Sequence, residues 1–416
     1  MAAVLSNEVK QALQDIYYNV RTGRGREAFA LLERASAAGD GDASCVLARC
    51  LCGYQYVWGG HNFPEDDARA TKLLHKSVEQ GSALGVLVAL RSGELTPSVQ
   101  KKMPFGSLRE AFDQVEALAK EGDAFCQYVI GNSYFWWDFL RIQDKGKDSF
   151  PNEAAFKAYL KGEISKCEDW FWKAFRGGVH FAANNLNRYY TQGDEDIIVP
   201  QPEKAKDLWK IGAELGYPSH QYIYATELKK QERYQEALHW FQESAAAPNS
   251  DCWYEIGFMY WNGKGVEVDK AYAVSCYEKE LELTPHNTGS HNGLGQAYFL
   301  GEGVAQDYAK AYYHLSYAYE KRGSEWGVFY LAKCCFYGLG TPQDYGKALQ
   351  FLSKVDWKNQ EADYMRGVIY AQGLGGVSAD IPKGVAYLQK AGNFDKAKEE
   401  LLHYKKTLFG KWVRRN

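Results

Sequence analysis

The sequence predicts an all-α fold, a right-handed α-α superhelical solenoid of about ten helix pairs. The first observation is a Gly-x-Gly turn that begins at Gly263, Gly301, Gly338 and Gly373, so successive turns lie 38, 37 and 35 residues apart. The second is that each turn joins two short stretches whose apolar residues recur three and four positions apart, the spacing of one helix face. Such a period is typical of solenoids, in which each unit buries its apolar side against its neighbours.

Length and composition agree with this architecture. The chain has 416 residues, of which 46% are hydrophobic and 15% aromatic, and this composition argues against disorder. The 40 Gly against 11 Pro favour many short helices that end at glycine caps. The net charge of −3 gives no electrostatic reason to expect a nucleic acid partner.

The sequence also carries a prediction about the compartment. The stretch from Met1 to Val20 has no basic segment followed by an apolar run, so we expect no secretory signal. No apolar run reaches the ~18 residues of a membrane helix, so no membrane insertion is expected. The nine cysteines do not recur once per repeat, which favours buried free thiols in a reducing compartment. These features together predict a cytoplasmic protein.

Residues 1–123 are predicted to form divergent N-terminal helical repeats. The expected helix pairs are 8–22 with 26–38, 42–53 with 66–80, and 83–92 with 107–121. Gly39, Gly81 and Gly122 follow the second helix of each pair, the position of a C-cap glycine. The basic side chains near the first turn, Arg21 among them, are interpreted as solvated turn residues.

Residues 124–250 are predicted to be helical repeats with an insertion at 141–166. The expected helix pairs are 124–140 with 167–178, 181–193 with 203–216, and 218–231 with 233–246. Within the insertion, the residues after Pro151 predict an additional helix. Aromatic residues flank the insertion and are predicted to form a core that anchors it, with a ligand pocket as the alternative: Tyr134, Phe135, Trp136, Trp137, Phe139, Trp170, Phe171 and Trp172.

Residues 251–392 are predicted to be the well-formed repeats. On their first helices Ile256, Gly257 and Tyr260 recur as a Leu-Gly-Tyr set in the next repeat, and the small residue allows the paired helix to approach closely. An aspartate precedes each second helix, in the place of an N-cap: Asp269, Asp307, Asp344 and Asp380. Residues 393–416 are predicted to be a C-terminal capping helix, from about Asp395 to Leu408, and a tail.

At these residues the chain resembles the Sel1-like repeat family, a relative of the tetratricopeptide repeats. The stretch Gly293–Lys354 carries the closest resemblance, through Gly301, Gly303, Val304, Asp307, Lys310 and Ala311. Residues 251–279 and 361–391 also match well, 124–216 match in their helices, and 1–123 match weakly. The resemblance implies an α-solenoid that binds proteins or peptides along its concave face, as adaptors and assembly factors do.

The sequence predicts no catalytic, cofactor or metal site, and hence no enzyme. It contains no G-x-S-x-G, H-E-x-x-H, phosphate-loop or C-x-x-C motif. The Gly-x-Gly turns join two helices rather than follow a strand, so a structural role is favoured over nucleotide binding. His180, His220 and His291 begin three predicted first helices, and a metal site would require the superhelix to bring two of them together.

The strongest functional signal is a stripe on the predicted first helices. One of its two positions carries only Tyr, Asn and Phe. Tyr offers amphipathic contact area, and Asn offers a hydrogen-bond donor and an acceptor together to a peptide backbone. An alternative is that several of the rings pack between neighbouring first helices. The predicted partner-binding residues in the concave groove are Tyr128, Asn132, Asn184, Arg188, Tyr222, Thr226, Tyr254, Phe258, Asn292, Gln296, Phe329, Lys333 and Tyr364.

We therefore expect a non-catalytic protein- or peptide-binding scaffold or adaptor that uses the concave face of the solenoid. The alternative is an accessory enzyme component or small-molecule-binding protein, with a pocket formed by the 141–166 insertion and the Trp-rich cluster. A third hypothesis is a self-assembling structural array.

Overall fold

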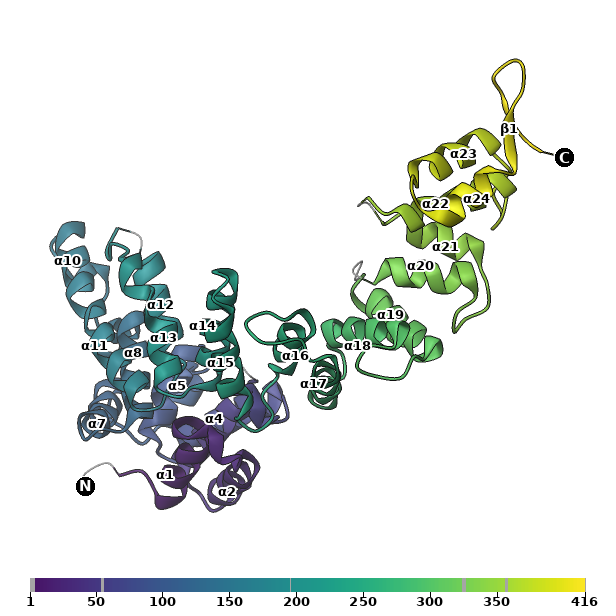
Figure 1. The fold of residues 1–416 in the computed structure, drawn as a ribbon. Coiled ribbons are helices and arrows are strands. Elements are labelled where there is room, and N and C mark those ends of the chain that lie inside the picture. The colour runs from purple at the N-terminus through teal and green to yellow at the C-terminus, as the bar shows by residue number, and fades with distance from the viewer. Residues whose placement is uncertain (1–3, 54–55, 195, 324–326, 356–357, 416) are drawn as a thin grey trace. The chain divides into compact units, whose positions relative to one another are not determined.

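The computed structural model describes residues 4–53, 56–194, 196–323, 327–355 and 358–415. The chain divides into two compact units, Met1–Ser250 (unit one) and Asp251–Asn416 (unit two). Each unit is a succession of helix pairs in which consecutive helices pack on one another (Figure 1). The predicted all-α solenoid fold is confirmed. The finer division at residues 123 and 392 stays a prediction.

The helices of unit one follow the predicted pairs, with short additional turns between them. In chain order they are α1 (Asn7–Leu13), the π-helix η1 (Gln14–Tyr18), η2 (Val20–Thr22), α2 (Gly25–Ala37), α3 (Gly41–Leu51), η3 (Gly59–His61), α4 (Asp67–Glu79), α5 (Ala83–Ser92), α6 (Pro97–Gln100), α7 (Leu108–Lys120), α8 (Ala124–Phe135), α9 (Asp138–Ile142), η4 (Lys147–Ser149), α10 (Glu153–Ile164), α11 (Lys166–Arg176), α12 (Ala182–Gln192), η5 (Pro202–Ala205), α13 (Leu208–Glu214), α14 (Pro218–Lys230) and α15 (Tyr234–Ala245). Polar caps begin several of them, because a side-chain oxygen accepts a bond from an otherwise unpaired backbone N–H. Asp40, Ser82 and Asp123 do so for α3, α5 and α8.

The expected helix 124–140 is interrupted, so that prediction was wrong in its second half. α8 ends at Phe135, and Trp137 has a φ of 66° in the left-handed region before α9 begins. The indole N–H of Trp137 donates to Asp194 over 2.7 Å, a tertiary bond that no local pattern indicates. The predicted insertion helix is confirmed as α10, and it buries Leu160 and Ile164 in the core of the unit.

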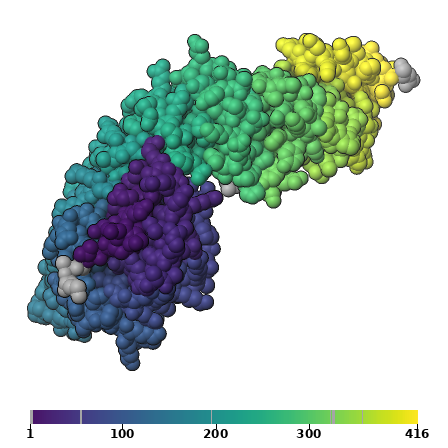
Figure 2. Space-filling view, turned by 90° about the horizontal axis from the view of Figure 1, so that it is seen from below, coloured from purple at the N-terminus to yellow at the C-terminus, as the bar shows by residue number. Residues whose placement is uncertain are grey.

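The N-terminal segment of unit one lies against the far end of the same unit. The Arg21 guanidinium donates to the carbonyl of Gly216, to the side chain of Gln221 and to the carbonyl of Glu243. Figure 2 shows the purple N-terminal part of the unit beside its teal part. The interpretation of Arg21 as a solvated turn residue was therefore wrong, because its partners are about 200 residues away in sequence.

Unit two contains the regular repeats. Its elements are α16 (Trp253–Asn262), α17 (Lys270–Leu283), α18 (Thr288–Leu300), α19 (Tyr308–Arg322), α20 (Val328–Tyr337), α21 (Tyr345–Leu352), α22 (Gln360–Gln372), α23 (Ile381–Lys390), α24 (Asp395–Leu401) and the strands β1 (Tyr404–Lys406) and β2 (Trp412–Arg414). The four aspartates predicted as N-caps each accept a bond from the backbone N–H three residues later, at 2.9–3.0 Å. The N-cap prediction is confirmed.

The two glycines of the Gly-x-Gly turn at Gly338 have different roles. Gly338 and Gly340 both have a φ near 70°, a conformation that favours glycine. A Cβ on Gly338 would meet only side-chain and backbone atoms of Gln343, at 3.4 Å or more. A Cβ on Gly340 would overlap the carbonyl oxygen of Tyr308, at the start of α19 in the preceding repeat. The second glycine therefore allows successive repeats to touch through their backbones.

The predicted C-terminal helix is shorter than expected. α24 ends at Leu401, and an antiparallel hairpin of β1 and β2 follows it. The hairpin places Tyr404, which is 2% exposed, and the half-buried Trp412 on the last apolar cluster of the unit. An aromatic anchor in extended backbone, rather than a longer helix, thus covers the end of the stack.

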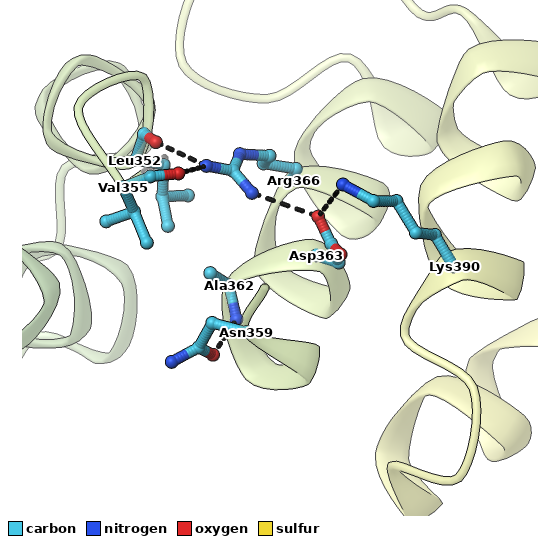
Figure 3. Close-up of polar contacts among 7 residues, drawn as sticks. All are labelled: Leu352, Val355, Asn359, Ala362, Asp363, Arg366 and Lys390. Atoms are coloured by element: carbon cyan, nitrogen blue, oxygen red, sulfur yellow. Dashed lines mark hydrogen bonds and ion pairs between the residues drawn. The ribbon is translucent and has the colours of Figure 1, made fainter. Parts of the chain in front are cut away.

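A charged network joins consecutive repeats near that end (Figure 3). Arg366 on α22 donates to the carboxylate of Asp363 at 2.9 Å and to the carbonyls of Leu352 and Val355. The first of these carbonyls belongs to the last residue of α21, where unpaired acceptors and the negative end of the helix dipole favour a cation. Lys390, whose side chain is 61% exposed, reaches the same carboxylate at 3.3 Å.

Two further observations concern membrane spans and cysteines. None of the described helices is both long and apolar enough to span a bilayer. None of the nine cysteines forms a disulfide in the described structure, and eight of them are buried. Burial raises the pKa of the Cys334 thiol to about 12, which keeps it protonated and unreactive.

Candidate functional site

Unit one contains a cavity of about 550 Å³ lined by several of its helices and the turns beside them. Tyr128 and Asn132 contribute from α8, Trp136 contributes from the residue just after it, and Asn184 and Asn185 contribute from α12. The other wall comes from α3, α4 and α5. The cavity therefore lies between side chains from four successive repeats, which the stacking of α3, α5, α8 and α12 brings together.

Predicted groove residues meet at this cavity. Tyr128, Asn132 and Asn184 line it, and the guanidinium of Arg188 lies 4.6 Å from the ring centre of Trp136, which also lines it. The other two predicted residues of unit one lie elsewhere, since Tyr222 packs on Phe241 and Thr226 donates its hydroxyl to the carbonyl of Tyr222.

Amide side chains form a small polar surface on the α8–α12 wall. The Nδ2 of Asn185 donates to the Oδ1 of Asn132 over 2.8 Å. This bond leaves the Nδ2 of Asn132 and the Oδ1 of Asn185 without a partner among the described residues. One donor and one acceptor side by side are what an extended peptide backbone requires.

Several of the predicted groove residues of unit two take part in contacts between neighbouring helices. Tyr254 fills the space beside Gly289 and contacts Tyr277, and Asn292, which is 6% exposed, lies beside Gly327. Phe258 lies near the ring of Tyr254, and Gln296 is half-buried. The ammonium group of Lys333 lies over the ring of Phe329 in a cation–π contact. The ring of Tyr364 packs against those of Phe336 and Phe394. The role of this set in partner binding stays a prediction, beside the alternative of packing between first helices.

Sequence reasoning missed two arginines in the cavity wall, Arg49 on α3 and Arg91 on α5. Arg91 donates to the carboxylate of Asp138 at 3.2 Å and to the carbonyl of Trp136. Burial raises the pKa of the Asp138 carboxyl to about 6, and Arg91 opposes that rise. One feature of the sequence could have identified Arg49. It is the single charged residue within the apolar run from Cys45 to Cys52.

The insertion does not form this cavity. Of the described residues that line it, Trp136 alone comes from the Trp-rich cluster and none comes from 141–166. The insertion instead packs through its Tyr159 on Phe139 of the cluster, with ring centres 5.9 Å apart. Most of the cluster lies in or against the core of the unit. The packing of the cluster therefore agrees with a core that anchors the insertion rather than with a ligand pocket.

The three histidines considered for a metal site lie in different surroundings. His180 and His220 are both buried in unit one, with ring centres 6.1 Å apart. His291 in unit two lies beside His314, with 2.9 Å between their Nδ1 atoms. Within the described ranges no group of three or more His, Cys, Asp or Glu residues is placed to hold a metal ion.

His220 makes the stability of unit one depend on pH. Burial lowers its pKa from 6.5 to about 3, and its Nε2 has no hydrogen-bond partner in the described structure. The unfolded chain binds the proton below pH 6.5 while the folded chain does not, so stability is lost as pH falls from 6.5 toward 3. We expect a loss of about 2–3 kcal/mol from this residue at about pH 4.5. Denaturant unfolding from pH 7 to 4.5 measures it.

The matched variant for this effect is His220→Phe, which keeps a ring in the space beside Gly212 and removes the titration. We expect its free energy of unfolding to fall less with acid than that of the unmodified chain. Equal slopes in the two proteins would assign the acid sensitivity to other groups, among them His180, whose pKa burial also lowers.

Comparison with known proteins gives a family and a number of similar solved structures. A model of the Sel1 repeat matches residues 25–40, 46–82, 180–217, 222–249, 252–279, 289–322, 327–354 and 360–393, together more than half of the chain. No curated protein matches the sequence.

Two of the similar solved structures illustrate the likeness. One is a protective antigen of uropathogenic Escherichia coli strains with an SLR fold, 18% identical over 89% of both chains, with a TM-score of 0.44. The other is a Sel1 repeat protein from Oxalobacter formigenes, 21% identical over 56% of this chain and 98% of that one, with a TM-score of 0.40.

Proposed function

Because the chain belongs to the Sel1 repeat family, we propose that it is a non-catalytic scaffold or adaptor that holds a protein or peptide segment on the first-helix side of its repeats. Repeats of this family commonly mediate protein–protein interaction and generally form non-enzymatic scaffolds. The chain would favour binding through preorganisation, because a rigid surface loses little conformational entropy when the partner binds.

A single observation supports the placement of the partner in unit one. The 550 Å³ cavity combines aromatic side chains with asparagine amides on two adjacent first helices. Tyr128 and Trp136 supply amphipathic and apolar area, and Asn132 with Asn185 presents a donor and an acceptor together. This mixture suits an extended peptide better than a uniformly apolar ligand.

Site-specific cross-linking tests the placement. A photoreactive phenylalanine analogue replaces Asn184, an exposed residue that lines the cavity, in the full-length chain. The matched position is Lys210 on α13, which is also exposed and does not line the cavity. In lysate of the source cell we expect protein adducts from position 184 and few from position 210, as read by mass spectrometry. Equal adduct yields at the two positions, or none at position 184, would contradict the proposal.

A further inference from the structure

The cavity of unit one contains an arginine that no carboxylate of the described residues neutralises. Arg49 on α3 is half-buried and lines the cavity. Its Nε–H donates to the hydroxyl of Tyr17 over a long 3.4 Å, and among the described residues no carboxylate pairs with it. A guanidinium has five N–H donors, so four of them remain without a hydrogen-bond partner in the described structure.

The other arginine that lines the cavity, Arg91, already has a counter-charge. Arg91 pairs with Asp138 at 3.2 Å, and Glu94 pairs with His75 at 3.0 Å. Arg24, elsewhere in unit one, pairs with the buried Asp15 at 3.0 Å. Arg49 thus differs from these groups, and a half-buried cation without a counter-charge is unfavourable unless a ligand supplies one.

Aromatic rings fix the guanidinium in place. Its carbon lies 5.1 Å from the ring centre of Tyr56, 5.5 Å from that of Phe125 and 5.6 Å from that of Tyr128. These contacts favour the cation and restrict its orientation without using its N–H groups. A planar fork held in this way is suited to two parallel bonds with a carboxylate.

We infer that the cavity binds a peptide segment through a carboxylate, which Arg49 holds while the asparagines of α8 and α12 bind the adjoining backbone. The inference rests on the proposed function and adds the chemistry of the partner. The carboxylate comes either from an acidic side chain or from a free C-terminus. Tyr128, Trp136 and Phe181 surround the neighbouring part of the ligand, which is therefore an apolar side chain.

The acidic groups at the cavity limit the ligand to few negative charges. Asp67 and Glu94 also line it, so a polyanion such as a nucleic acid would meet like charge beside Arg49. A ligand with a single carboxylate next to apolar residues would avoid this repulsion. The distribution of charge therefore favours a peptide over a run of phosphates.

Binding of defined peptides tests the inference. The probes are N-acetylated hexapeptides in three sets of the same apolar composition. The first set has a free C-terminal carboxylate and no acidic side chain, the second has a C-terminal amide and one Glu, and the third has a C-terminal amide with Gln in place of Glu. The immobilised full-length chain is exposed to all three, and retained peptides are counted by mass spectrometry.

We expect the first or the second set to be retained about tenfold better than the third, the usual scale of one charge-assisted bidentate contact. Whichever set prevails identifies the source of the carboxylate. Arg49→Gln is expected to abolish the preference. The matched control Arg69→Gln changes net charge equally at an exposed pair with Glu33, and should leave the preference unchanged.

Each contrary result has its own meaning. Equal retention of all three sets by the unmodified chain would overturn the carboxylate assignment and leave peptide binding intact, and so would an unchanged preference in Arg49→Gln. Retention of no set, together with no adducts at position 184, would overturn the proposed function as well. If circular dichroism shows that Arg49→Gln does not fold, Arg49→Lys replaces it: loss of the planar fork should weaken the preference several-fold, and an unchanged preference overturns the inference.

Discussion

Gly340→Ala is expected to lower the free energy of unfolding by about 3–5 kcal/mol. The new Cβ would overlap the carbonyl oxygen of Tyr308, a backbone atom of the preceding repeat that cannot rotate away. The φ of 68° adds the strain of an L-residue in the left-handed region. Denaturant unfolding of the full-length chain measures the loss, and hydrogen exchange should place it in α19, α20 and α21.

Gly338→Ala is the matched control for this substitution. Its φ of 70° imposes the same strain, but its Cβ would find ordinary contact with Gln343 at 3.4 Å. We expect a loss of only about 1–2 kcal/mol from the backbone conformation. The difference between the two variants isolates the contact between repeats. Equal losses would show that the second glycine is required for its conformation alone.

Arg366→Met is expected to lower the free energy of unfolding by about 2–4 kcal/mol. The side chains of Arg366 and Asp363 are 12% and 2% exposed, so removal of the cation leaves a buried carboxylate with only the more distant Lys390. It also removes the donor to the Leu352 carbonyl at the end of α21. The methionine keeps most of the apolar stem, which confines the effect to the polar contacts.

Lys390→Met is the comparison for this network. Its side chain is 61% exposed and contacts the same carboxylate at 3.3 Å, so solvent screens most of its contribution. We expect a change of about 0–1 kcal/mol, as for other exposed ion pairs. Equal losses in the Lys390 and Arg366 variants would show that charge at Asp363, rather than the bonds to α21, holds these repeats together.

The repeats of unit two were predictable because their determinants are local. An aspartate three residues before the N–H that it accepts from, and a glycine in the left-handed region after a helix, are each fixed by a few adjacent residues. The same reasoning failed at Trp137 and after Leu401. There a bond to Asp194 and the burial of Tyr404 decide the backbone.

The candidate site was predictable only in part. The first-helix spacing identified Tyr128, Asn132 and Asn184, because residues at equivalent places of a repeat share one side of the stack. It could not identify Arg49, since the period is weakest in the N-terminal repeats. Nor could it show that Tyr222 packs on Phe241 rather than at the cavity.

The sequence by itself determined the helix pairs, their caps, the Gly-x-Gly turns and the family, because each depends on residues within one or two turns of helix. The tertiary structure decided what depends on distant partners. It brought Arg21 to Gly216 and Glu243 and placed α3 beside α8 and α12 around one cavity. The physical reason is that a repeat period specifies contacts between neighbouring units, whereas burial and charge between distant segments are fixed only once the chain has folded.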